Sequence, residues 1–106
     1  MKNEETKLQD AIRAELSKAG IVRRNNVGTF LTINGNPINI GLPGEADLTL
    51  FQRSGKTIFI EVKTPTGRQS KQQRAFQKRV EELGFKYKIV RSLDDAKNLI
   101  LEVSNE

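Results

Sequence analysis

Apolar residues near the start of the chain recur every three or four positions, which is the spacing of one face of an α-helix. These residues are Leu8, Ala11, Ile12, Leu16 and Ala19. The pattern predicts a helix over residues 4–19, and Gly20 follows it as a residue type that commonly ends helices.

Short apolar runs rich in β-branched residues fill the middle of the chain. They occupy residues 21–25, 30–33, 38–40, 46–51 and 57–63. Asn34-Gly35 separates the second run from the third and favours a hairpin turn. Residues 53–56 contain a glycine and separate the last two runs, which we therefore expect to be central antiparallel strands.

The last third of the chain returns to helical spacing. Ser70 is a helix-capping residue type, and the pattern predicts a helix from it to Leu83, ended by Gly84. A strand is predicted over residues 85–90. Ser92 with Asp95 three residues later has the spacing of a capping box and predicts a final helix. The predicted fold is α/β, with a mixed sheet flanked by helices.

Length and composition restrict the chemistry that this fold can perform. The 106 residues suffice for one compact domain, which we assign to residues 1–106. The chain has no cysteine and no histidine, which excludes disulfides, thiolate metal sites and histidine-based catalytic triads. A net charge of +5 favours a polyanionic partner such as nucleic acid.

The chain shows no signal for secretion or membrane insertion. Its first ten residues lack an apolar segment, and no apolar run approaches the ~20 residues that span a bilayer. We therefore expect a soluble, cytoplasmic protein.

Two neighbouring predicted strands carry acidic residues that an apolar core would not favour. Asp47 lies in the first, and Glu61 and Lys63 lie in the second. Side chains alternate along a strand, so Glu61 and Lys63 share a face, and Asp47 can lie across from them. Mg²⁺ prefers such oxygen ligands, and a nearby lysine can stabilise charge on a phosphate. The alternative is an ordinary ion pair of Asp47 with Lys63 at a strand edge, with Glu61 solvated.

Three segments closely resemble the VRR-NUC family of the PD-(D/E)XK nuclease superfamily. They are Gly44-Glu45-Ala46-Asp47, Ile60-Glu61-Val62-Lys63-Thr64-Pro65-Thr66-Gly67 and Ser70-Lys71-Gln72-Gln73. The resemblance extends from residue 4 to residue 90, through the first helix and the segment Arg24-Asn25-Asn26-Val27-Gly28. One departure is Ala46, where the family has proline before the aspartate. The chain resembles the stand-alone form found in phages, which implies a bacterial or phage-infected host cell.

The resemblance implies a restriction-endonuclease-like αβββαβ core and a Mg²⁺- or Mn²⁺-dependent nuclease. Asp47, Glu61 and the backbone carbonyl of Val62 would bind the metal, and Lys63 would be the catalytic lysine. A glutamate of the first helix and a glutamine of the second would complete the site, and by spacing these are Glu5 and Gln73. Two further sequence features bear on that assignment.

Glu15 is the second choice for the glutamate, because it faces the apolar stripe of the first helix and needs a partner there. Gln73 also has a structural reading, since Ser70-x-x-Gln73 is itself a capping box. A basic stripe on the same helix is a candidate DNA-binding surface, although a solvated surface face is the common case. It consists of Arg68, Lys71, Arg74 and Lys78.

Three functions remain open from the sequence. The first is a metal-dependent DNA endonuclease in replication, repair or recombination. Stand-alone relatives resemble dimeric junction-cleaving enzymes, so branched DNA such as a four-way junction and a homodimer are expected. The predicted hairpin is the candidate interface, with Phe30, Leu31, Ile33, Ile38 and Ile40. The other two are a non-catalytic nucleic-acid-binding module and a structural or interaction protein.

Overall fold

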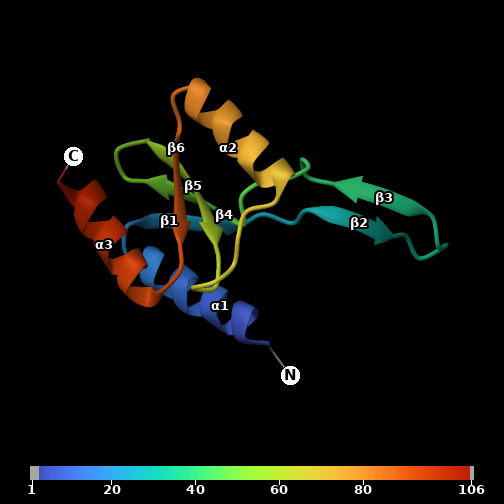
Figure 1. Ribbon diagram of the computed structural model, residues 1–106, viewed down its shortest axis with the longest axis horizontal. Helices are drawn as coiled ribbons and strands as arrows, with labels where there is room; N and C mark the ends of the chain where they lie inside the picture. Colours follow the sequence, from blue (N-terminus) through green and yellow to red (C-terminus); the bar gives the residue numbers. More distant parts are fainter. Residues whose placement is uncertain (1–2, 106) are drawn as a thin grey trace.

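A four-stranded mixed sheet with helices on both faces forms the body of the protein in a computed structural model, which describes residues 3–105 (Figure 1). The helices are α1 (Glu4–Leu16), α2 (Lys71–Glu82) and α3 (Leu93–Ser104). The strands are β1 (Gly20–Arg24), β2 (Gly28–Leu31), β3 (Pro37–Ile40), β4 (Leu48–Gln52), β5 (Thr57–Val62) and β6 (Lys86–Val90).

The strand order of the main sheet is β1-β4-β5-β6. β4 pairs antiparallel with both β1 and β5, so the central antiparallel pair predicted from the sequence is confirmed. β6 pairs parallel with β5, and α2 makes the crossover between them. Without the β2–β3 hairpin, the order of elements is the expected αβββαβ, followed by α3.

The alternation of side chains divides the apolar residues between the two faces of the sheet. One face packs against α1 and α3, and its centre is formed by Leu48, Leu50, Ile58 and Ile60, all fully buried. The other face packs against α2 through Ala46, Val80 and Tyr87. In β5 the positions of opposite parity, which include Phe59 and Glu61, face α2.

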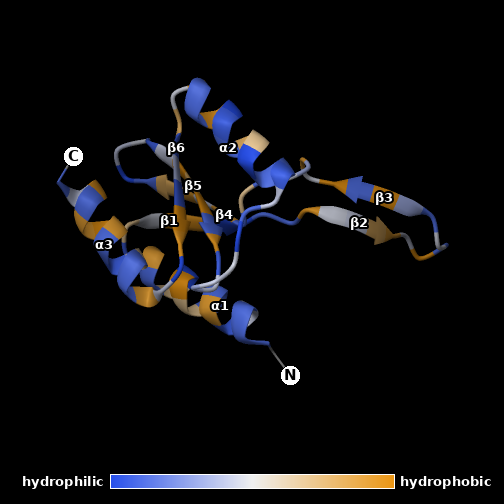
Figure 2. Cartoon of the chain, viewed as in Figure 1, coloured by the Kyte–Doolittle hydropathy of each residue, from blue (hydrophilic) through white to orange (hydrophobic). Residues whose placement is uncertain are grey.

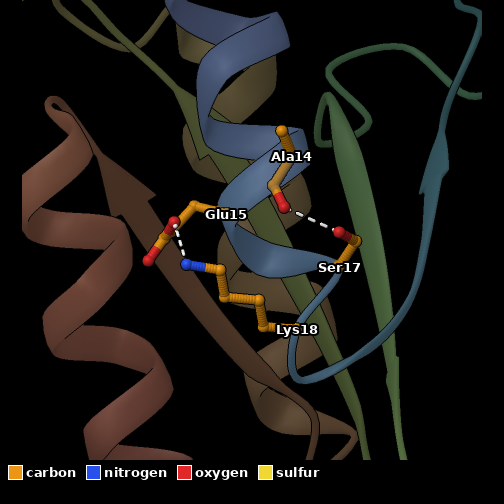
Figure 3. A network of polar contacts seen from close by, with 4 residues as sticks. All are labelled: Ala14, Glu15, Ser17 and Lys18. Atoms are coloured by element: carbon orange, nitrogen blue, oxygen red, sulfur yellow. Dashed lines mark hydrogen bonds and ion pairs between the residues drawn. The ribbon is translucent and has the colours of Figure 1, made fainter.

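The first helix is shorter than the sequence pattern predicts. It ends at Leu16, and Ser17 caps it by donating its hydroxyl to the Ala14 carbonyl (Figure 3). Gly20 does not terminate the helix but begins β1. A side chain there would place its Cβ 2.0 Å from the Phe51 carbonyl oxygen, so the close pairing of β1 with β4 requires glycine.

The predicted hairpin forms, but outside the main sheet. β2 and β3 pair only with each other and project away from the body, linked by the five-residue loop 32–36 (Figure 1). Gly35 adopts φ +81° in this loop. Apolar colour runs along much of the projecting ribbon (Figure 2), and every residue of the two strands is exposed.

The caps of α2 and α3 differ in one respect. Ser70 and Gln73 form a reciprocal capping box, as predicted. Ser92 accepts a hydrogen bond from the Asp95 backbone, but the Asp95 carboxylate accepts from the Arg91 N–H instead of from Ser92. Aspartate is one methylene shorter than the glutamate of a capping box, and the second half of the box does not form.

No helix in the described residues is long and apolar enough to cross a membrane.

Candidate active site

Asp47 and Glu61 meet at one end of the central strand pair. Leu48 pairs with Ile60, so the next step of the antiparallel register places Asp47 opposite Glu61. Asp47 Oδ2 accepts a hydrogen bond of 2.8 Å from the Val62 N–H. The two carboxylates that the sequence singles out therefore lie opposite each other, with Glu61 in β5 and Asp47 directly before β4.

Asn25 holds the strand end that carries Asp47. Its backbone N–H donates to the Asp47 carbonyl at 2.8 Å. Its side-chain amide donates to the Ala46 carbonyl at 3.0 Å and to Thr49 Oγ1 at 2.9 Å. Two of these bonds fix the backbone at Ala46 and Asp47, the third holds the Thr49 side chain, and together they give the Arg24-Asn25 segment a structural role.

Glu61 is fully buried, and its two carboxylate oxygens differ in their hydrogen bonding. Oε1 accepts a hydrogen bond of 2.9 Å from the Tyr87 hydroxyl, whereas Oε2 has no hydrogen-bond partner within residues 3–105. Burial raises the pKa of Glu61, and the hydrogen bond from Tyr87 and the charge of Lys63 oppose that rise. A buried carboxylate oxygen without a partner is costly, and a cation would satisfy it.

Asp47 is partly buried, and burial is the main cause that raises its pKa. The Val62 N–H and the Lys63 ammonium lower that pKa, whereas the negative charge of Glu5 raises it. Glu5 therefore lies close enough to interact electrostatically with Asp47.

Lys63 follows β5 directly and is half-buried. Its backbone N–H donates to the Val90 carbonyl at 3.1 Å, which continues the pairing with β6. Its positive charge lowers the pKa of both Asp47 and Glu61. The structure thus brings two carboxylates and one ammonium together, as the strand pattern predicts.

The two glutamates of α1 that could complete the site lie in different surroundings. Glu15 pairs with Lys18, with Glu15 Oε2 2.9 Å from Lys18 Nζ, and 15% of its side chain is exposed (Figure 3). Ten residues of helix, about 15 Å, separate it from Glu5. Lys18 is thus the partner that the inward-facing Glu15 needs, and Glu5 is the glutamate whose charge acts on Asp47.

Gln73 stands at the start of α2. Its Oε1 accepts from the Ser70 N–H at 2.7 Å, and its own N–H donates to Ser70 Oγ at 3.1 Å. Gly44, three residues before Asp47, contacts this turn so closely that a Cβ there would lie 2.2 Å from the Gln72 carbonyl oxygen. That contact brings the start of α2 to the chain segment that leads into Asp47.

Three polar residues of the site were not predicted from the sequence. The Tyr87 hydroxyl donates to Glu61, and Gln69 donates to both Tyr87 and Gln77. Arg91 Nη1 donates to the Thr64 and Gly67 carbonyls, at 2.8 and 2.6 Å, and holds the loop between Lys63 and α2. Their partners are distant in the sequence, so strand alternation alone gives no signal for these contacts.

The basic residues of the predicted stripe are all exposed. Lys71, Arg74 and Lys78 lie on α2, and Arg68 lies in the preceding loop. Arg74 Nη1 also donates to the Gln69 carbonyl at 2.8 Å, which anchors that side chain beside the start of the helix.

The arrangement at Asp47 and Glu61 is compatible with a hard divalent cation. No preformed cluster of three or more acidic side chains with metal-binding spacing occurs in the part of the chain that the structure describes. Mg²⁺ does not need one, because it is commonly held by one or two carboxylates and completed by waters and substrate phosphates. Glu61 Oε2, which has no hydrogen-bond partner among residues 3–105, is an oxygen of the type that such an ion prefers.

Comparisons with known proteins agree with this fold. The family model described as the VRR-NUC domain matches residues 3–94. A solved structure titled "VRR_NUC domain" is similar with a TM-score of 0.70 and 22% sequence identity, covering 93% of this chain and 96% of that chain. No curated protein matches. The chain belongs to the VRR-NUC family, a family of nucleases, and has its restriction-endonuclease-like α/β fold.

Proposed function

We propose that this protein is a DNA endonuclease that requires Mg²⁺ or Mn²⁺ to hydrolyse phosphodiester bonds. The observation that carries the proposal is the buried Glu61, which lies opposite Asp47 and near Lys63 and whose Oε2 has no hydrogen-bond partner among residues 3–105. An apolar strand end gains nothing from two carboxylates, and a metal site explains why both are there.

Asp47 and Glu61 would hold the ion, with the Val62 carbonyl and Glu5 as further oxygen donors. When bound, the metal supplies Lewis acidity toward the phosphate and lowers the pKa of a coordinated water. The hydrogen bond from the Val62 N–H fixes Asp47 Oδ2, so the other oxygen of Asp47 remains available. Asp47 and Glu61 would then each offer one oxygen to the ion.

Lys63 would act on the substrate and not on the metal. An ammonium held beside two carboxylates can orient the attacking water or stabilise the negative charge that develops on the phosphate. Gln73 would assist from the start of α2, where its Oε1 caps the helix and its amide NH₂ lies outside the capping box. Exposed Arg68, Lys71, Arg74 and Lys78 would contact the DNA backbone.

Cleavage of a DNA panel in Mg²⁺ and in EDTA tests the proposal. Cleavage in Mg²⁺ alone is expected, and Asp47→Asn should abolish it while the unfolding temperature changes little. The matched control is an acid outside the site, Glu15→Gln, which removes only the pair with Lys18 and should keep activity. Glu5→Gln should reduce activity if Glu5 completes the site.

Two results would contradict the proposal. DNA binding without cleavage would favour the alternative of a non-catalytic nucleic-acid-binding module. Full activity of Asp47→Asn would show that the acidic pair is not the active site.

We further propose that the enzyme acts as a homodimer on branched DNA such as four-way junctions, in replication, repair or recombination. The support is the projecting hairpin, which leaves Phe30, Ile38 and Ile40 together on one exposed face. Residues 25–44 contain no charged side chain, in a chain of net charge +5, which suits a second copy of the protein better than a phosphate backbone. A two-fold dimer would place two sites symmetrically.

A further inference from the structure

A chain of hydrogen bonds connects α2 and the loop before it to Glu61. Gln69 Nε2 donates to Gln77 Oε1 at 2.9 Å and to the Tyr87 hydroxyl oxygen at 3.3 Å. The Tyr87 hydroxyl then donates to Glu61 Oε1 at 2.9 Å. The amide nitrogen of Gln69 has two hydrogens and uses both, so the Tyr87 oxygen accepts and its only proton points to Glu61.

This direction makes the two oxygens of Glu61 unequal. Oε1 is engaged by Tyr87, and Oε2 is the buried atom without a partner in the described chain. The phenol cannot move easily, because Tyr87 is 5% exposed and its ring packs against that of Phe76, with 6.5 Å between the two ring centroids. The Glu61 carboxylate group is therefore held in one orientation, and Oε2 is the oxygen that remains to bind a metal ion.

We propose that Tyr87 is a positioning residue that restricts Glu61 to monodentate metal binding through Oε2. The inference rests on the proposed metal-dependent activity and adds a cause of metal selectivity to it. Gln69 supports the same arrangement, since it donates to the Tyr87 oxygen and also acts directly on Glu61, whose pKa it lowers.

Monodentate binding matters because divalent ions differ in the coordination geometry and the carboxylate binding mode that they prefer. Mg²⁺ requires near-ideal octahedral geometry at about 2.0–2.1 Å, whereas Ca²⁺ readily takes both oxygens of one carboxylate at longer distances. A carboxylate with one oxygen already engaged disfavours the bidentate mode. Tyr87 should therefore favour Mg²⁺ over Ca²⁺ at this site.

The test is the affinity of metal-free protein for Mg²⁺ and for Ca²⁺, measured by calorimetry without DNA. Tyr87→Phe removes only the hydroxyl and keeps the ring. We expect its Mg²⁺ affinity to fall by about tenfold, as is typical for loss of an outer partner of a metal ligand. Its Ca²⁺ affinity should change by less than about threefold, because the freed carboxylate can bind that ion through both oxygens.

Two further variants separate positioning from packing. Gln69→Leu leaves Tyr87 in place. It should also lower the ratio of Mg²⁺ affinity to Ca²⁺ affinity, but by a smaller factor than Tyr87→Phe does. Phe85→Leu disturbs the aromatic packing on the same face of the sheet, where the Phe85 ring centroid lies 5.5 Å from that of Phe59, and it leaves Tyr87 and its hydroxyl in place. It should lower the unfolding temperature and leave the affinity ratio unchanged.

An unchanged ratio in Tyr87→Phe and Gln69→Leu would overturn the inference, whether both affinities stay constant or fall equally. That result would leave the proposed nuclease function standing if the wild type still binds Mg²⁺ and cleaves DNA. A wild-type protein that neither binds Mg²⁺ nor cleaves would instead refute the proposed function itself.

Discussion

Glu61 is a residue that the fold buries at a cost. Its side chain is fully buried, its pKa is raised by that burial, and one of its oxygens has no partner within the described residues. For a carboxyl group, a folded-state pKa above the unfolded value means that ionisation opposes folding. The stability that Glu61 contributes when protonated is present at low pH and is lost as the pH rises through its raised pKa.

We therefore predict that Glu61→Gln stabilises the metal-free protein at neutral pH while abolishing cleavage. The neutral amide removes the ionisation cost and the repulsion of Asp47. For a chain of this length, a gain of 1 kcal/mol raises Tm by roughly 4 °C. Thermal unfolding in EDTA at several pH values measures the effect, which should shrink as the pH falls toward 4.5, the ordinary pKa of glutamate. A variant less stable than wild type at every pH would contradict the prediction.

Lys63 is predicted to serve turnover and not metal binding. Lys63→Met keeps the aliphatic stem beside Gly67 and removes the charge. Loss of one charged group that stabilises the transition state typically costs about 10²-fold or more in kcat. Mg²⁺ affinity from calorimetry should stay within a few-fold of wild type. The exposed Lys97→Met on α3 is the matched control and should retain full activity. Lost metal affinity with normal turnover would reverse these roles.

The residues of the acidic pair could be identified from the sequence, but their hydrogen-bond partners could not. Asp47, Glu61 and Lys63 stand out because charged residues interrupt apolar strands, and alternation alone places Glu61 and Lys63 on one face. Tyr87 reaches Glu61 only because β6 pairs parallel with β5 in the register Glu61↔Ile89. That register depends on packing between segments 26 residues apart, which local patterns do not encode.

At the scale of elements, the helix caps and central strands follow local sequence, whereas two boundaries depend on distant contacts. Ser70 with Gln73 forms its capping box from side chains three residues apart. The end of α1 and the start of β1 are set by the approach of Gly20 to the Phe51 carbonyl, across the sheet. The hairpin forms from its own turn residues, but its separation from the main sheet could not be predicted from them.

The basic stripe on α2 is the element for which we predict DNA backbone contact. Lys71→Ala, Arg74→Ala and Lys78→Ala should each weaken binding to a similar extent for all DNA sequences. Each should also lower the slope of log affinity against log salt concentration by about one unit, because one phosphate contact is lost. Arg79→Ala on the same helix is a control. Arg79 lies outside the stripe, and its Nη1 is 3.9 Å from Glu82 Oε2. Unchanged slopes in all three variants would show that the stripe is ordinary solvated surface.

At the scale of the whole molecule, the hairpin is the part that the rest of the fold does not explain. A two-stranded hairpin is marginally stable in water without something packed on it. Here Phe30, Ile38 and Ile40 are 45%, 47% and 43% exposed on one face, and Ile33 in the loop is 101% exposed. No core residue of the described chain belongs to the hairpin. The absent packing partner is what a second copy of the chain would supply.

We predict a homodimer that uses this hairpin face, to be measured by light scattering at micromolar concentration. A stable interface commonly covers roughly 800 Å² on each partner. The double variant Phe30→Thr with Ile38→Thr keeps residues that suit a strand, removes apolar area and should be monomeric. Ile21→Thr is the matched control, because Ile21 is 72% exposed on β1, and it should remain dimeric. Equal stability of the Thr variants would exclude unfolding as the cause.

The dimer also predicts the substrate. Two symmetric sites can cut two equivalent strands, so the wild type should cleave a four-way junction faster than a linear duplex. The monomeric double variant should lose this preference while its metal site at Asp47 and Glu61, outside the hairpin, still hydrolyses phosphodiester bonds. A wild type that is monomeric, or that cuts both substrates equally, would contradict the dimer and the junction without affecting the metal-dependent chemistry. The hairpin would then require another partner to cover its apolar face.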